Sequence, residues 1–247
     1  MLAPDPDKMR AAGRAAAATL KLAGASLRPG MTTADINRIV HEDTIKRGGI
    51  PATLNYKCFP ASCCVSVNDV VCHGIPGPLV IKEGDIVNID VTTIIDGHYG
   101  DTNATFLVGE VDPKVKHLVA VTEQAMYAGI VQVRPGAMLG RVGAAIADVI
   151  MNHDYSIVRE FGGHGIGRRF HLPPHVHHYG LGTEGPQLVP GMFFTIEPMV
   201  TMGSPKIFLE ADGWTVRAQD GLPSAQFEHT IMVTETGYEI MTLAEDA

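Results

Sequence analysis

Basic residues are scarce in this sequence. Lysine and arginine together number 19, against 27 aspartates and glutamates, and the formal net charge is -8. Proteins that bind nucleic acid need clustered lysine and arginine to neutralise phosphates. The basic pairs Lys46-Arg47 and Arg168-Arg169 stand alone in the chain. The composition therefore argues against a broad nucleic-acid interface, and we expect no direct nucleic-acid specificity.

Long uncharged hydrophobic runs are also missing. The alanine-rich segment 11–27 comes nearest, but Arg14 and Lys21 interrupt it, so it falls short of the ~20 apolar residues that span a bilayer. It predicts an amphipathic helix instead, with Asp5 as the N-cap and Pro6 at the first helical position. We expect no membrane association and a cytoplasmic location.

Cysteine is limited to four residues, at positions 58, 63, 64 and 72, and no two of them form a C-x-x-C pair. A chain of 247 residues can bury a sizeable core without disulfide cross-links. We therefore expect reduced, packed thiols, with a structural zinc site at this cluster as the alternative. The hydrophobic content of 45% with 19% charged residues is that of an ordinary soluble globular protein.

What the sequence does contain is a weak internal duplication. Arg28-Pro-Gly and Arg134-Pro-Gly each lie between two predicted helices, and the run ending at Asp90 is echoed by the run ending at Glu197. Chance recurrence of a helix-ending turn explains the first match but not the second. The pattern predicts, besides the first helix, helices at 33–46, from Asp112-Pro113 onward, and at 139–152.

The duplication predicts an α+β fold. Two α/β halves, about 1–118 and 119–247, would be related by a pseudo-twofold axis, with their strands in one curved antiparallel sheet and helices on its outer face. A site at their junction would take residues from both halves. No linker rich in proline, glycine and serine separates them, so we predict one domain over 1–247.

Five residues that can bind metal follow one another along the chain, each within a short apolar run. They are Asp90, Asp101, His164, Glu197 and Glu228. Desolvating an unpaired charge costs several kcal/mol or more. Four carboxylates and an imidazole at core-like positions therefore imply a large positive charge between them, most simply a pair of divalent metal ions.

A predicted hairpin brings the first two carboxylates together. The turn signal Asp96-Gly97 would place Asp90 opposite Asn103 and Asp101 opposite Thr92, about 7 Å apart at Cα on one face. That separation suits metal ions ~3.5–4 Å apart. A bulge in the second strand would alter this register, and a turn-flanking surface position is the alternative for Asp101.

One histidine with four carboxylates is an oxygen-rich ligand set. Manganese, iron, cobalt or zinc would bind to it. Two ions that share a bridging water would produce a hydroxide near neutral pH and could polarise a carbonyl. His171 could join His164 only if a loop brought them together, and His175, His177 and His178 are predicted to be surface-loop residues.

Six motifs together resemble type I methionine aminopeptidases of the bacterial kind. In order along the chain they are Asn68-Asp-Val-Val-Cys-His73-Gly-Ile-Pro76, Asp90, Asp101, Gly163-His164-Gly-Ile-Gly, Phe194-Thr-Ile-Glu197-Pro and Ser224-Ala-Gln-Phe-Glu228-His-Thr. The resemblance implies the pita-bread metallopeptidase fold and a dinuclear metal centre. It also implies removal of the initiator methionine from nascent polypeptides, preferentially before a small second residue. A monomer with possible transient ribosome association is expected.

The resemblance also implies roles for individual residues. The five residues named above would be the metal ligands, with Glu197 relaying a proton to the leaving amine, and His73 and His171 would contact substrate and stabilise the tetrahedral intermediate. The methionine side chain would be held by Tyr56, Phe59, Cys64, Phe170 and Trp214. A monovalent cation, Na⁺ or K⁺, would be held by the backbone carbonyls of Asn68, Val70 and Ser224.

Two positions depart from the family pattern. Thr53 stands where many bacterial members have cysteine, and Phe59 where tyrosine is frequent.

Two other classes of protein share part of the family pattern. Aminopeptidase P and prolidase share the fold and ligand set, but they usually carry an additional N-terminal domain, for which no room is expected before Asp5. Non-catalytic pita-bread modules that bind peptides lose metal ligands, and none is lost here.

Overall fold

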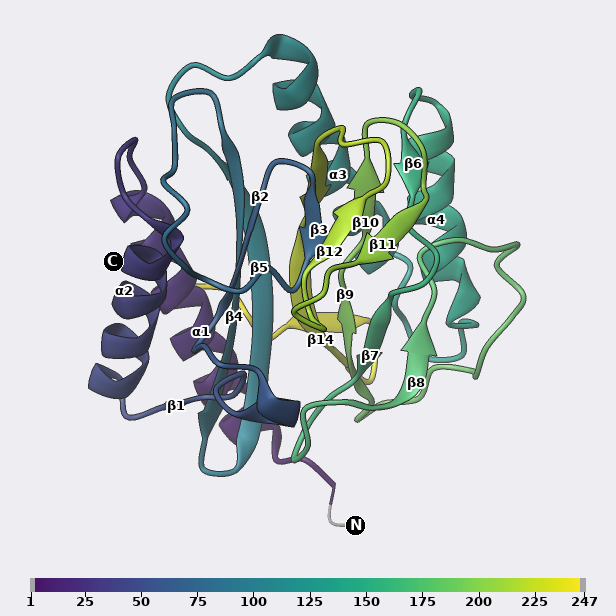
Figure 1. Ribbon diagram of the computed structural model, residues 1–247. Helices are drawn as coiled ribbons and strands as arrows, with labels where there is room; N and C mark the ends of the chain where they lie inside the picture. The colour runs from purple at the N-terminus through teal and green to yellow at the C-terminus, as the bar shows by residue number, and fades with distance from the viewer. Residues whose placement is uncertain (1–2, 245–247) are drawn as a thin grey trace.

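A nine-stranded antiparallel sheet with helices packed against it forms the frame of the molecule (Figure 1). The computed structural model describes residues 3–244. The helices in this range are α1 (Pro6–Ser26), α2 (Thr33–Lys46), α3 (Pro113–Ile130) and α4 (Gly140–Met151), with a short turn of helix at Tyr56–Cys58.

The large sheet has the strand order β1-β4-β5-β14-β9-β7-β8, and β2 and β15 pair with β4 and β14. Its strands are β1 (Ile50–Pro51), β2 (Cys64–Val67), β4 (Ile86–Ile95), β5 (His98–Leu107), β7 (Gly163–Gly165), β8 (Leu172–Val176), β9 (Phe193–Ile196), β14 (Glu228–Val233) and β15 (Tyr238–Ile240). Two three-stranded sheets have the orders β13-β10-β6 and β11-β12-β3. Their strands are β3 (Val70–Cys72), β6 (Ser156–Ile157), β10 (Met199–Thr201), β11 (Ile207–Leu209), β12 (Val216–Ala218) and β13 (Ser224–Gln226).

The helices begin where their capping residues predict. The Asp5 side chain accepts a hydrogen bond from the backbone N–H of Asp7, and Pro6 opens α1. At α2, Thr32 and Asp35 form a reciprocal capping box, which satisfies two backbone donors that the first turn leaves unpaired. The four predicted helices are confirmed, and the bounds that were predicted agree within a few residues.

Each half of the chain builds its own core on the sheet. Helix α1 packs on β4 and β5, and α2 packs against α1, β1 and β2, around Ile36, Val87 and Ile89. In the other half, α3 packs against β9, β10 and β13, and α4 packs against α3, β6 and β8, around Ile146 and Phe194. The pairing of β5 with β14 joins strands from the two halves. The predicted antiparallel sheet is therefore confirmed, and this pairing supports the prediction that both halves belong to one domain.

The β4–β5 hairpin has the predicted register. Asp90 pairs with Asn103, and Thr92 pairs with Asp101. Asp96 and Gly97 have φ angles of +48° and +70°, as a tight primed turn requires, and the ladder runs without a bulge. Gly100 lies directly against α1, since a Cβ there would come within 2.4 Å of the Ala12 backbone. Helix α1 therefore supports the strand segment that carries Asp101.

Three of the four cysteines are packed inside, as predicted. Cys63, Cys64 and Cys72 are buried, and Cys58 is exposed. Burial raises the pKa of all three buried thiols above the ordinary value. Between residues 3 and 244, no helix combines the length and apolar character needed to cross a membrane.

Candidate metal centre and substrate cavity

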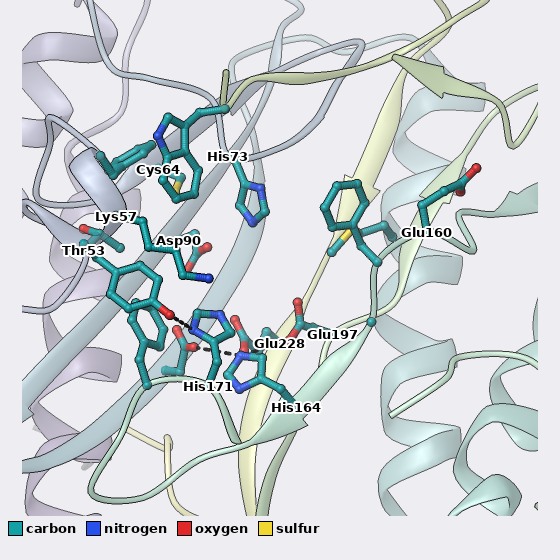
Figure 2. Close-up of a pocket in the computed structure, with 18 of the residues that line it drawn as sticks. Thr53, Lys57, Cys64, His73, Asp90, Glu160, His164, His171, Glu197 and Glu228 are labelled. Atoms are coloured by element: carbon teal, nitrogen blue, oxygen red, sulfur yellow. Dashed lines mark hydrogen bonds and ion pairs between the residues drawn. The ribbon is translucent and has the colours of Figure 1, made fainter. Parts of the chain in front are cut away.

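A cavity of about 400 Å³ opens between the two halves of the molecule. Its walls contain all five predicted metal ligands, both predicted substrate histidines and the five predicted pocket residues. Figure 2 shows Glu197 and Glu228 near each other, with His164 and His171 beside them, and Asp90 nearer to Lys57 and Cys64 in this view. The structure therefore brings together residues that lie up to 172 positions apart in the sequence (Tyr56 and Glu228).

The five predicted ligands converge because their strands are neighbours. Asp90 lies in β4, Asp101 in β5, His164 in β7, Glu228 at the start of β14, and Glu197 directly after β9. The His164 Nε2 atom is 3.6 Å from an oxygen of Asp101 and 3.6 Å from an oxygen of Glu197. Asp101, His164 and Glu228 offer three ligand atoms that all lie within 4.8 Å of one another.

Neutral donors hold these carboxylates in position. Thr92 Oγ1 donates to Asp101 over 2.7 Å, Asn103 Nδ2 donates to Glu228 over 2.8 Å, and Thr195 Oγ1 donates to Glu197 over 2.7 Å. Each donor lies on the same strand as its carboxylate or on the paired strand. Within residues 3–244, no lysine or arginine forms an ion pair with the cluster. The sheet therefore orients three of the four acidic groups without neutralising them.

The cluster lacks positive charge, and this fits divalent metal ions. Asp90 Oδ1 and Glu228 Oε1 are buried and have no hydrogen-bond partner among the described residues, which is costly for a polar atom. Burial raises the pKa of Asp101 to about 7, and it raises the pKa values of Asp90, Glu197 and Glu228 well above their ordinary range, with further contributions from neighbouring carboxylates. Burial lowers the pKa of His164 to about 4, which leaves a neutral imidazole that can bind a cation.

The two predicted substrate histidines are held by different contacts. The His171 ring lies 4.2 Å from the His164 ring, centroid to centroid, and its Nδ1 is 2.9 Å from the Tyr56 hydroxyl. The loop therefore does bring His171 to His164. The His73 ring packs edge-on against Phe161 and Trp214, and its ring nitrogens have no hydrogen-bond partner within residues 3–244. Burial lowers the pKa of His73 to about 4. Burial also lowers the pKa of His171 to about 3, and neighbouring charges add smaller contributions.

One prediction for the histidines after His171 is wrong. His178 is not a surface-loop residue: its side chain is 1% exposed, and its Nε2 accepts a hydrogen bond of 3.1 Å from the backbone N–H of Glu197. His175 is exposed, as predicted, but it lies in strand β8 and not in a loop, so its prediction is wrong in that part. The chain alternates between faces here, so Val176 and His178 point inward whereas His175 and His177 are exposed. This period-2 alternation was the signal in the sequence that could have identified His178.

Thr53, where the sequence departs from the family pattern, also lines the cavity. Lys57 and Glu160 line it too, and neither carried a signal in the sequence. Lys57 belongs to a turn in which non-glycine residues adopt positive φ angles, +46° for Lys57 itself, and its Nζ lies 5.4 Å from the Tyr56 ring centroid. A non-glycine residue in the left-handed region is uncommon. The position of this side chain therefore could not be derived from residue types.

The residues predicted to hold a monovalent cation lie on adjacent segments. The Ser224 N–H donates to the Asn68 carbonyl over 2.9 Å, and Asn68 has a φ of +54°. Val70 is the first residue of β3, and Ser224 is the first residue of β13, the strand that packs beside β3. The structure thus brings these backbone segments together, and cation binding there stays a prediction.

We expect His178→Ala to destabilise the fold. The change leaves the Glu197 N–H, at a buried position, without an acceptor, and an unpaired buried donor costs about 1–3 kcal/mol. Thermal unfolding should show a lower midpoint for this variant. The matched control is His177→Ala at the neighbouring exposed position, which should change stability by less than about 0.5 kcal/mol. Equal midpoints for the two variants would contradict this role of His178.

Comparisons with known proteins show which family and which relatives this sequence matches. The sequence matches metallopeptidase family M24 over residues 7–235. It is 52% identical over 238 residues to a methionine aminopeptidase of Rickettsia prowazekii (strain Madrid E), which covers 96% of this chain and 92% of that protein.

Solved structures give the same relationship. The crystal structure of methionine aminopeptidase from R. prowazekii has a TM-score of 0.95 at 52% identity, with 96% of each chain covered. Methionine aminopeptidase from Thermotoga maritima has a TM-score of 0.94 at 39% identity, again with 96% of each chain covered. A prolidase from Pyrococcus furiosus has a TM-score of 0.79 at 19% identity and covers 97% of this chain and 64% of that chain, which shows likeness of fold alone.

Proposed function

Because the chain belongs to metallopeptidase family M24, we propose that it is a methionine aminopeptidase that removes the initiator methionine from nascent polypeptides, preferentially before a small second residue. The motif resemblance and the pita-bread fold are confirmed at the level of the family and of its solved structures. The observation that carries the activity is the buried carboxylate cluster, with two unpaired oxygens, at the base of an aromatic-lined cavity.

The five predicted ligands would hold two divalent ions. Their oxygen-rich donor set admits manganese, iron, cobalt or zinc. Ions bound there supply Lewis acidity, which polarises a peptide carbonyl and makes water more acidic. A sodium or potassium ion at the carbonyls of Asn68, Val70 and Ser224 is a further part of the proposal.

The protein's own groups would move the proton and stabilise the developing negative charge. Glu197 would accept the proton of the attacking water and pass it to the leaving amine, while Thr195 and Gln226 hold its carboxylate in place. His171 and His73 are neutral, so each can donate one N–H. If the Tyr56 hydroxyl donates to Nδ1 of His171, the proton of that ring is on Nε2 and can be donated to the substrate.

The side chain of the first residue would lie among aromatic rings. Phe59 and Trp214 meet edge-on with ring centroids 5.1 Å apart, and Tyr56 and Phe170 lie 4.9 Å apart. Cys64 pairs with Asp90 in the β2–β4 ladder, which places a thiol next to the metal ligands. A thioether gains about 0.3–1.5 kcal/mol from each contact with an aromatic ring. None of these five side chains carries a charge that could pair with a charged side chain of the substrate.

Peptide hydrolysis tests the proposal. The value of kcat/KM should be high for Met-Ala-Ser, lower by at most about tenfold for the norleucine analogue, because one sulfur contact is worth up to about 1.5 kcal/mol, and far lower for the lysine analogue. An Xaa-Pro peptide tests the prolidase alternative. Equal cleavage of the methionine and lysine peptides would refute the pocket, and preferred cleavage of the Xaa-Pro peptide would refute the proposed function.

The proposed substrate also defines the partners. N-termini of nascent polypeptides are made in the cytoplasm, where we propose that the protein acts as a monomer with transient ribosome association. The acidic net charge of -8 disfavours broad contact with ribosomal RNA. Any such association would therefore depend on a local surface.

A further inference from the structure

One histidine of the cavity wall, His175, has a second histidine, His177, beside it, and neither belongs to the set of predicted metal ligands. His175 is in β8, the last strand of the large sheet, and His177 follows directly after it. Residues two apart in an extended chain point to the same side, and their ring centroids are 4.5 Å apart with the planes at 80°. Val176 between them points into the core. We call His175 and His177 the rim histidines.

The ring nitrogens of the rim histidines are not engaged elsewhere. Within residues 3–244, neither ring forms a hydrogen bond or an ion pair, whereas the rings of His164, His171 and His178 each form at least one hydrogen bond. Their other ring contact is that of His177 with Tyr179, 5.2 Å between centroids. Both residues are exposed, so their rings are accessible to an external ligand.

The surroundings favour a cation as that ligand. His175 lines the cavity and pairs with His164 across the β7–β8 ladder. Neutral imidazole is the commonest protein ligand for transition metals.

We propose that the rim histidines form a second metal site, which binds one imidazole-preferring divalent ion such as Ni²⁺, Cu²⁺ or Zn²⁺. The site differs in chemistry from the carboxylate centre, because nitrogen ligands select these ions and oxygen ligands favour Mn²⁺. Among residues 3–244, three metal-binding side chains lie together at the carboxylate centre, whereas the rim offers only the two histidines. Two protein ligands with water in the remaining positions make a weaker, exchangeable site.

Occupancy of this site would affect the cavity. His175 contributes to the wall through which a peptide reaches the carboxylates. A hydrated ion on the rim histidines would narrow that opening and add positive charge near the incoming N-terminal amine. Binding of the ion itself does not depend on the proposed peptidase activity.

Equilibrium dialysis against Ni²⁺ tests the proposal. Excess Mn²⁺ in the buffer limits Ni²⁺ binding at the carboxylate centre, which the parent and the variants share, and metal analysis gives the Ni²⁺ bound per chain. The parent protein should bind one Ni²⁺ more than the double variant His175→Asn/His177→Asn. Each single variant should bind that ion at least about 100-fold more weakly, because even an outer partner of a metal ligand contributes 10–100-fold to affinity.

The chain offers a matched control. His117 and His153 form another histidine pair, on α3 and after α4, with ring centroids 5.0 Å apart. Its geometry is similar, but His117 Nδ1 is engaged with the Tyr155 hydroxyl over 2.8 Å. The variant His117→Asn/His153→Asn should bind as much Ni²⁺ as the parent. Equal Ni²⁺ content in the parent and the rim double variant, both folded by circular dichroism, would overturn the proposal.

Discussion

Replacing Asp101 by asparagine should abolish peptide hydrolysis and lower the content of bound divalent metal. Asparagine keeps the volume of the side chain, and its amide oxygen can still accept the hydrogen bond from Thr92 Oγ1 that Asp101 accepts. What the change removes is one negative charge and one metal-binding oxygen. Loss of an outer partner of a ligand costs 10–100-fold in metal affinity or activity, so loss of a ligand should cost more than about 100-fold. Metal analysis and turnover of Met-Ala-Ser measure the two effects.

Asp96→Asn is the matched control for this prediction. Asp96 lies on the same hairpin, is exposed, and has a φ of +48°, which asparagine tolerates well. This variant makes the same chemical change outside the cavity, so we expect parental turnover and metal content. An Asp101→Asn protein that keeps parental activity after treatment with a chelator would contradict the assignment of the metal centre.

The parts of the fold that were predictable depend on local interactions. The Asp96-Gly97 turn determines the β4–β5 register, and through it the faces on which Asp90 and Asp101 lie. The caps at Asp5 and Thr32 likewise determine where α1 and α2 begin. In each case the interaction spans a few residues, so residue types alone indicate it.

The parts that were missed depend on contacts between distant segments. Period-2 alternation could have indicated that His178 is buried, but not that its ring contacts the backbone of Glu197, 19 residues away, because this contact depends on the strand order of the sheet. Lys57 reaches the cavity through a turn whose positive φ angles fall on non-glycine residues, so no glycine in the sequence indicates this turn. The aromatic pocket was inferred from the family resemblance, because aromatic residues at these positions are equally typical of a core.

Replacing His171 by alanine should lower kcat by ~10²–10³-fold, the usual cost of removing one donor that stabilises a transition state. Metal content should stay constant, since the ring packs against the ligand His164 but lies outside the carboxylate set. KM should change little by comparison, because the proposed N–H donation acts on the charge that develops during the reaction. Steady-state kinetics and metal analysis on the same preparation separate these quantities.

Tyr56→Phe gives a graded version of the same test. It keeps the aromatic ring that lies beside Phe170 but removes the hydroxyl that is 2.9 Å from His171 Nδ1. A net hydrogen bond is worth about 0.5–1.5 kcal/mol, so kcat should fall by about two- to tenfold while preference for methionine persists.

If metal content instead falls together with kcat in His171→Ala, His171 is a metal ligand. The neutral ring would then act on the metal ions, and its proposed contact with substrate would be wrong.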